Sequence, residues 1–325
     1  MNSRHQDNGI LRLTHDIAAA DNQGLALHVR QARPRSPARG TVVLVHGATL
    51  ASGLWDIQVP GYSILDALAA AGFSAWAPDL RGYARSQRLQ NPDRPYSGRD
   101  EAVLDIAATV EHACRSDGTS RVVLVGGSWG SITTAIFASR HPGRVGALAL
   151  MAPIFANVNS GWLRDLADPH DRTRRREPRA ATRKIDGHGL RTRWDEEVVF
   201  GDPLSRRDPL VLDALLSDAL QAEEQPCDAF TVPNGTLDDL FEAFSGRPLY
   251  DPSKLAMPVL LVRGEHDATS TDDDARRLFA ALGSRDKIYL QVGGSGHFLC
   301  AERQAGFFRT ALIDFCFANA GADPL

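Results

Sequence analysis

The feature that most constrains the fold of this chain is an alternation of short apolar runs with longer amphipathic stretches. The apolar runs lie at residues 41–45, 74–78, 121–125, 145–150, 258–262 and 287–292. The stretches 64–71, 101–114, 131–140, 272–282 and 302–320 place apolar residues three and four positions apart. Runs this short and β-branched are typical of strands buried on both faces. Strands that alternate with helices predict an α/β fold, with a mostly parallel central sheet flanked by helices.

Two segments and one long interval depart from this rhythm. Residues 11–17 and 25–31 alternate more loosely and predict an antiparallel hairpin at one sheet edge. Residues 155–254 separate two buried strands by far more than an ordinary connection, contain amphipathic stretches at 210–221 and 237–244, and show no strand pattern. We therefore expect a helical lid or cap over one end of the sheet at 155–254, with 1–154 and 255–325 forming the core domain.

The charges of this interval are divided unevenly along the sequence. Residues 164–193 hold ten basic and five acidic side chains, whereas residues 194–251 hold three basic and fourteen acidic ones. The basic cluster predicts either an anion-binding face or a half that pairs with the acidic half or is solvated. The second interpretation is favoured, because exposed charges normally need no special partner. The cluster consists of Arg172, Arg174, Arg175, Arg176, Arg179, Arg183 and Lys184.

The composition narrows the classes of function. A formal net charge of −4 gives no reason to expect nucleic acid as a partner. The four cysteines are widely spread without a C-x-x-C pair, which argues against a zinc site or a disulfide framework and fits a reducing compartment. No apolar run reaches 18 residues and the first nine residues are polar, so we expect a cytoplasmic protein without a membrane span.

The motif G-x-S-x-G occurs at Gly126-Gly-Ser128-Trp-Gly130. Alone it is a weak signal in a chain with 28 glycines, but here it follows a predicted buried strand and opens a predicted helix, which is the setting that the motif requires. Such a turn lifts the serine hydroxyl clear of the sheet, and the helix directs its N-terminal N–H groups to the same place. A nucleotide-binding turn is the alternative, but the chain has no G-x-x-x-x-G-K-[ST] sequence. Ser128 is the predicted nucleophile.

A serine nucleophile needs a base and a carboxylate that orients the base. Among ten histidines, His297 follows the last predicted strand after four small residues, and His266 is its rival in another post-strand loop. The carboxylate comes from Gly264-Glu265-His-Asp267, where Asp267 lies farther beyond the strand end than Glu265. We predict His297 and Asp267, which gives the chain order Ser, Asp, His that this setting requires.

The negative charge that develops during such a reaction needs two backbone N–H groups in an oxyanion hole. One is expected from Trp129, the residue after the nucleophile. The other is expected from the loop after the strand at 41–45, where Ala48 is the favoured donor and Thr49 the alternative.

With these residues in place, the chain resembles the α/β-hydrolase superfamily over nearly its whole length outside 155–254. The resemblance is carried by the following segments in order: His46-Gly47, Asp79-Leu-Arg-Gly82, the turn at Ser128, Gly264-Glu-His-Asp267 and Gly296-His297-Phe298. It implies a lid inserted after the sixth strand and a structural role for Asp79 and Arg81. The chain departs from the family at Ala84, where relatives often carry glycine, which leaves room for a local loop change. Epoxide hydrolases and haloalkane dehalogenases of the superfamily use aspartate where this chain has Ser128, which argues against those activities.

The predicted function is serine hydrolysis of an ester, lactone or thioester of a mainly apolar small molecule, with no metal or organic cofactor. Carbon–carbon bond hydrolysis, a lyase or cyclase reaction, or low-turnover ligand binding stay open, because fold alone does not choose the reaction. Thr49, Trp162 and Phe298 are the predicted substrate contacts. Aromatic residues at 155, 162, 194, 200 and 230 either line the pocket or form the core of the cap. The expected partner is a small-molecule substrate, and a homodimer is an open possibility.

Overall fold

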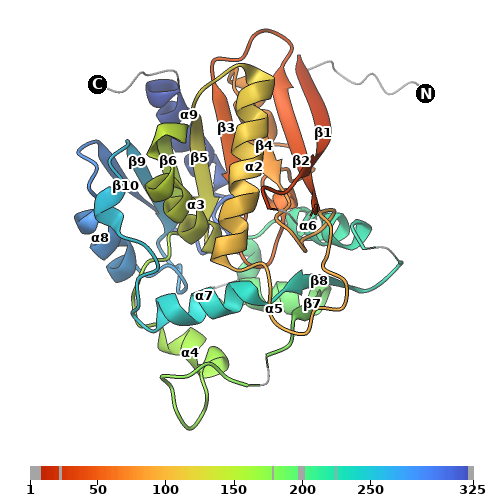
Figure 1. Ribbon diagram of the computed structural model, residues 1–325, viewed down its shortest axis with the longest axis vertical. Coiled ribbons are helices and arrows are strands. Elements are labelled where there is room, and N and C mark those ends of the chain that lie inside the picture. Colours follow the sequence, from red (N-terminus) through yellow and green to blue (C-terminus); the bar gives the residue numbers. More distant parts are fainter. Residues whose placement is uncertain (1–8, 22–23, 178, 197–201, 224, 321–325) are drawn as a thin grey trace.

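The computed structural model describes residues 9–21, 24–177, 179–196, 202–223 and 225–320, and its centre is a mixed eight-stranded sheet. The strand order is β1-β2-β4-β3-β5-β6-β9-β10 (Figure 1). β1 and β2 form the expected antiparallel hairpin at one edge, β2 also pairs antiparallel with β4, and the remaining neighbours are parallel. The strands are β1 (Ile10–Ala18), β2 (Ala26–Pro34), β3 (Thr41–Val45), β4 (Ser74–Pro78), β5 (Val122–Gly127), β6 (Val145–Met151), β9 (Val259–Gly264) and β10 (Lys287–Val292).

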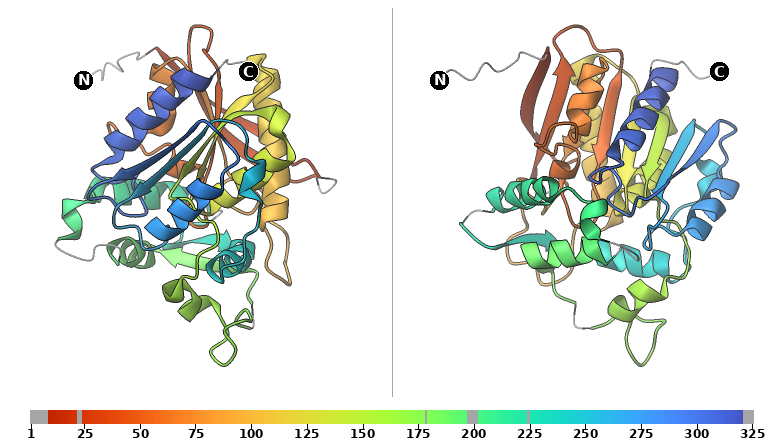
Figure 2. Two further views of the ribbon diagram at one scale, coloured as in Figure 1. Left: turned by 90° about the vertical axis from the view of Figure 1, so that its left-hand side faces the viewer. Right: turned by 180° about the vertical axis from the view of Figure 1, so that it is seen from behind.

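Helices cover both faces of this sheet, as the alternation in the sequence predicts. α2 (Arg99–Asp117) and α3 (Trp129–Arg140) pack together on one face, and α1 (Ile64–Ala70) and α9 (Ala305–Asn319) lie on the other (Figure 1 and Figure 2). α8 (Asp272–Ala281) packs beside β9. Every residue of β3 and β5 is buried, so the two strands that lead into the loop at residues 46–50 and into the serine turn run through the middle of the core.

The interval between β6 and β9 lies across the end of the sheet at which the parallel strands finish (Figure 1 and Figure 2). We call residues 155–254 the cap. Its elements are α4 (Ser160–Leu166), β7 (Thr182–Asp186), α5 (Gly187–Asp195), α6 (Pro209–Gln221), β8 (Ala229–Pro233) and α7 (Gly235–Phe244).

The expectation that the cap contains no strand is wrong. β7 and β8 form a two-stranded antiparallel sheet with Arg183 opposite Val232 and Lys184 opposite Thr231. Each strand has only five residues and β7 is partly exposed along its whole length, so it lacks the apolar run that marks a buried strand. α5 and α6 intervene between the two strands, so no short turn announces their pairing.

The two oppositely charged halves of the cap make ion pairs with each other. Asp238 on α7 forms ion pairs with Arg175 at 3.2 Å and with Arg179 at 3.0 Å. Acidic residues of α6 and the segment that follows it also pair with the core, where Arg30 contacts Asp218 and Arg88 contacts Glu223 at 2.5 Å. These contacts agree with the interpretation in which the basic half pairs with the acidic half.

Two further features bear on the accessibility of the molecule. Within the described ranges, no helix has the length and apolar character needed to cross a bilayer. Cys114, Cys300 and Cys316 are buried, whereas Cys227 is exposed on the cap between α6 and β8.

Candidate active site

Ser128 stands in the turn between β5 and α3 with a strained backbone, at φ 55° and ψ −122°. The glycines on either side are required by close packing. A Cβ on Gly126 would lie 2.3 Å from the carbonyl oxygen of Gly130, and a Cβ on Gly130 would lie 2.4 Å from that of His46. The Ser128 N–H donates to the Met151 carbonyl at 2.9 Å, which ties the turn to the end of β6. The turn therefore has the geometry that the motif predicts.

His297, in the loop after β10, and Asp267, in the loop after β9, lie next to Ser128. The Ser128 Oγ lies 2.8 Å from His297 Nε2, and His297 Nδ1 lies 3.0 Å and 2.9 Å from the two carboxylate oxygens of Asp267. Asp267 Oδ1 also accepts the backbone N–H groups of Thr269 and Ser270, at 2.9 Å and 2.8 Å. A carboxylate beside Nδ1 favours the tautomer with the proton on Nδ1, which leaves Nε2 free to accept the serine proton.

The rival residues considered from the sequence lie elsewhere. The side chains of His266 and Glu265 are 35% and 46% exposed and lie 3.5 Å from each other. Glu265 accepts the N–H of Gly294 at 2.9 Å, so it links the loop after β9 to the loop after β10. The structure thus brings Ser128, His297 and Asp267 together and leaves this pair at the surface.

The loop after β3 lies directly against the serine. A Cβ on Gly47 would lie 3.1 Å from the Ser128 Cβ. His46 is fully buried, with Nδ1 2.7 Å from the Gly47 carbonyl and Nε2 accepting the N–H of Leu80 at 3.1 Å. Burial lowers the pKa of His46, so this imidazole is held neutral and fixes the loop. The loop therefore brings Ala48 beside the serine.

The second predicted oxyanion donor lies at the start of α3. The Trp129 N–H belongs to the first residue of the helix, where N–H groups have no partner within the helix. The loop after β3 and the N-terminus of α3 thus both lie next to Ser128.

Comparison with known proteins identifies the family. The family described as "alpha/beta hydrolase fold" matches residues 40–304. The chain belongs to the α/β-hydrolase family. The characterised relatives are distant. Triacylglycerol lipase 1 of Arabidopsis thaliana, for example, is 32% identical over 149 residues, which is 43% of this chain and 38% of the lipase. The match thus spans well under half the length of that relative.

Solved structures agree with the fold over nearly the whole chain. Epoxide hydrolase A from Mycobacterium thermoresistibile superposes with a TM-score of 0.64 at 17% identity, covering 95% of this chain and 99% of that one. A meta-cleavage product hydrolase from Pseudomonas fluorescens superposes with a TM-score of 0.63 at 18% identity, covering 94% and 98%. At these identities the likeness establishes the fold and not the substrate.

A pocket opens above the serine of this α/β hydrolase and encloses about 580 Å³ of space, its mouth included. Thr49, Trp162 and Phe298, the predicted substrate contacts, all line it together with Ser128 and His297. The other lining residues are Gly47, Ala48, Leu50, Leu54, Met151, Ile154, Arg193, Leu240 and Thr269. The wall is mainly apolar, and both the core and the cap contribute to it.

The aromatic residues predicted at the cap divide between lining the pocket and supporting its walls. Trp162 stacks on Phe244 and lines the pocket. Trp194 is buried behind Phe298, with ring centroids 4.7 Å apart. Phe155 packs on Tyr250 away from the pocket lining, and Phe200 lies outside the described residues.

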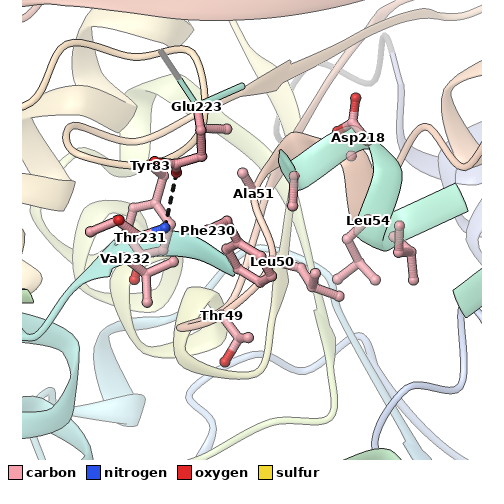
Figure 3. Close-up of a pocket in the computed structure, with 14 residues that line it drawn as sticks. Thr49, Leu50, Ala51, Leu54, Tyr83, Asp218, Glu223, Phe230, Thr231 and Val232 are labelled. Carbon is pink, nitrogen blue, oxygen red and sulfur yellow. Dashed lines mark hydrogen bonds between the residues drawn. The ribbon is translucent and has the colours of Figure 1, made fainter. Parts of the chain in front are cut away.

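A second pocket, with about 350 Å³ of space including its open mouth, is drawn in Figure 3. It shares Thr49, Leu50 and Leu54 with the first pocket. Phe230 of β8 lines this side pocket rather than the one above the serine. Asp218 and Glu223 also line it, and both are already paired with arginines of the core.

Two further residues at the site carry no signal in the sequence. Arg193 of α5 lines the pocket above the serine, lies over the Trp162 ring at 5.2 Å and donates to Thr269 Oγ1 at 2.6 Å. Asp239 of α7 is buried and accepts the Trp129 indole N–H at 3.0 Å, the Arg99 backbone N–H at 2.7 Å and its guanidinium at 2.6 Å. Burial raises the pKa of Asp239, and the bonds from Trp129 and Arg99 oppose that rise. The partners of both residues lie tens of positions or more away in the sequence, so spacing alone does not reveal them.

Proposed function

We propose that this α/β hydrolase is a serine hydrolase that cleaves an ester, lactone or thioester of a mainly apolar small molecule. The observation that carries the proposal is the chain of contacts from Ser128 Oγ through His297 to Asp267, at 2.8 Å and 2.9 Å, on the floor of an apolar pocket. A buried base within hydrogen-bond distance of a serine hydroxyl is what nucleophilic catalysis requires.

In the proposed mechanism, Ser128 Oγ attacks the substrate carbonyl carbon while its proton passes to His297 Nε2. The carbonyl oxygen becomes an oxyanion and is held by the N–H groups of Ala48 and Trp129. As the tetrahedral intermediate collapses, the bond to the leaving group breaks and His297 returns the proton to that group. Water then attacks the acyl-enzyme with His297 again as base, which frees the acid and restores Ser128. Asp267 stabilises the protonated imidazole at each stage.

The mainly apolar lining of the pocket supports an apolar substrate, and some of the lining residues are candidates for contacting it. Trp162 and Phe298 contribute aromatic surface to the pocket that Ser128 lines, and Thr49 follows the proposed oxyanion donor. We assign these three residues to substrate binding. The matched plant relative is named a triacylglycerol lipase, which is consistent with an ester substrate.

The first prediction tests the nucleophile. A fluorophosphonate probe should label the wild-type protein, and p-nitrophenyl esters of graded chain length should be hydrolysed. Ser128→Ala should abolish labelling and lower kcat by several orders of magnitude, because no other group replaces the attacking oxygen. The melting temperature of the variant should stay within about 2 °C of wild type, since one small polar side chain is removed.

Two outcomes contradict the proposal. Wild-type turnover in the Ser128→Ala variant would remove Ser128 from the mechanism. A wild-type protein that neither reacts with the probe nor cleaves any ester of the series would favour a binding protein, or a reaction of another class in the same pocket.

A further inference from the structure

One arginine of the cap reaches directly into the oxyanion loop of the core. Arg183 lies on β7, and its Nη2 donates to the Ala48 carbonyl at 2.6 Å. Its Nη1 donates to the Pro233 carbonyl and to the Asn234 side-chain oxygen, both at 2.9 Å, where β8 meets α7. The guanidinium thus joins the small sheet of the cap to the loop that carries the proposed oxyanion donor.

The Ala48 carbonyl has a second donor from the core. The Tyr83 hydroxyl, which is fully buried, donates to the same oxygen at 3.0 Å. Tyr83 and Thr49 line the side pocket together with Thr231 and Val232 of β8, the strand that pairs with β7 (Figure 3). The carbonyl therefore lies at the contact between core and cap and is held from both sides.

Fixing the carbonyls on both sides of Ala48 fixes its N–H. A peptide group is planar, so the Ala48 N–H points opposite to the Gly47 carbonyl, which His46 Nδ1 holds at 2.7 Å. The next peptide plane is fixed through the Ala48 carbonyl by Arg183 and Tyr83. With both planes held, neither backbone torsion of Ala48 can relax without breaking a hydrogen bond. Donors preorganised in this way need no rearrangement when negative charge develops.

The positive charge of Arg183 is also placed where it can help to stabilise the negative charge that develops on the substrate oxygen. The partners of its guanidinium within the described residues are neutral oxygens: two backbone carbonyls and one amide. Burial lowers the pKa of Arg183, but a guanidinium stays protonated in proteins. A positive charge bound to the Ala48 carbonyl polarises the Ala48–Thr49 peptide, whose N–H belongs to Thr49, the alternative oxyanion donor.

We propose that Arg183 is a positioning residue for the oxyanion hole, supplied by the cap, so that hydrolysis requires the cap to be seated on the core. This inference rests on the proposed function and adds a specific residue to it. Arg183 does not itself line the pocket above Ser128 and contacts that lining through the backbone carbonyl of Ala48, so its removal should affect the transition state more than the binding of substrate.

The test compares Arg183→Met and Arg183→Lys with a matched control in the full-length protein. Arg88→Met removes another arginine at the boundary between core and cap, the one paired with Glu223, without touching the oxyanion loop. For each variant kcat and KM are measured with a p-nitrophenyl ester, together with the inhibition constant of a trifluoromethyl ketone, whose hemiketal with the serine mimics the tetrahedral intermediate. Thermal melting reports on folding.

We expect Arg183→Met to lower kcat by about 10- to 100-fold, below the loss from removing an oxyanion donor outright. KM should change less than threefold, and the affinity for the trifluoromethyl ketone should fall in parallel with kcat. Arg183→Lys should recover part of both losses, and it also serves as the test if the methionine variant fails to fold. Arg88→Met should keep kcat within threefold of wild type.

Wild-type kcat and ketone affinity in both Arg183 variants would overturn the inference while leaving the serine mechanism intact. Equal losses in Arg183→Met and Arg88→Met would also overturn it, because they would indicate general loosening of the cap. A wild-type protein inert to esters and to the fluorophosphonate probe would overturn the proposed function itself, and the inference with it.

Discussion

At the scale of single residues, Ser128 combines a strained backbone with well-placed side-chain contacts. A non-glycine residue in this region of backbone torsions costs about 1–3 kcal/mol and persists only where its surroundings impose it. The surroundings here are the hydrogen bond to Met151 and the close packing at Gly126 and Gly130. Ser128, Asp267 and His297 could be predicted because each follows a buried strand within a recognisable local pattern. Asp239 and Arg183 could not, because their roles depend on partners 110 and 135 positions away.

The second prediction concerns the orienting carboxylate. Asp267→Asn should lower kcat by about 10³- to 10⁴-fold, since an amide favours the wrong imidazole tautomer and cannot stabilise the protonated ring. Fluorophosphonate labelling should slow in parallel. Glu265→Gln is the matched control in the same loop, and its kcat should stay within threefold of wild type. A full loss in the control and none in Asp267→Asn would exchange the two assignments.

The third prediction concerns Ala84, where relatives often carry glycine. The residue adopts a left-handed φ of 41°, so the backbone keeps the conformation that glycine favours instead of changing the loop. The left-handed region costs a residue with a Cβ about 1–2 kcal/mol, partly offset by the greater unfolded-state freedom of glycine. Ala84→Gly should therefore stabilise the protein by about 0.5–1 kcal/mol in urea unfolding, whereas destabilisation would show that the methyl group is needed for packing.

At the scale of elements, the central strands β3, β4, β5 and β9 were predictable because their short apolar runs are buried along their whole length. The short elements of the cap were not. α4 has seven residues, β7 and β8 have five each, and α5 begins with Gly-His-Gly, a poor start for a helix by intrinsic propensity. Their conformation is decided by packing against α7 and against each other, so local sequence carries little of the information.

The fourth prediction concerns the attachment of α7 to the serine turn. Asp239→Asn should destabilise the protein by about 2 kcal/mol, because the amide has one acceptor oxygen in place of two and turns an NH2 group toward a donor of Trp129 or Arg99. Asp238→Asn, one position earlier, loses only partly exposed ion pairs with Arg175 and Arg179 and should cost less than about 1 kcal/mol. Chemical denaturation measures both values, and equal costs would show that the buried carboxylate does not anchor the helix.

At the scale of the whole molecule, the cap is joined to the core by contacts spread along its length. Phe155 and Ala156 donate their N–H groups to Asp274 at its start, and Arg30 pairs with Asp218 in its middle. The division into a core and an insertion could be predicted from the length of the interval alone. The position of the cap on the core could not be predicted, because it depends on ion pairs between residues that are far apart in the sequence.

The fifth prediction uses this arrangement. Residues 169–174 form an exposed segment of the cap with arginines at 172 and 174. Among the cleavage sites from residue 24 to residue 320, trypsin should therefore cut first in this segment. The two fragments should stay associated, because β6 of the first fragment remains paired with β9 of the second, and Asp274 still accepts the N–H groups of Phe155 and Ala156. Gel electrophoresis with and without denaturant, followed by mass spectrometry, measures this. A first cut within α2 or α3 would show that the core opens more readily than the cap.

The solitary exposed thiol among the described cysteines gives this molecule a natural reporter. Cys227 lies on the cap while its three counterparts are shielded inside the protein. A maleimide dye or a nitroxide spin label can therefore be attached at one site in the unmodified protein. Its fluorescence or spectral line shape would record in real time whether the cap moves during a turnover, without any engineered substitution.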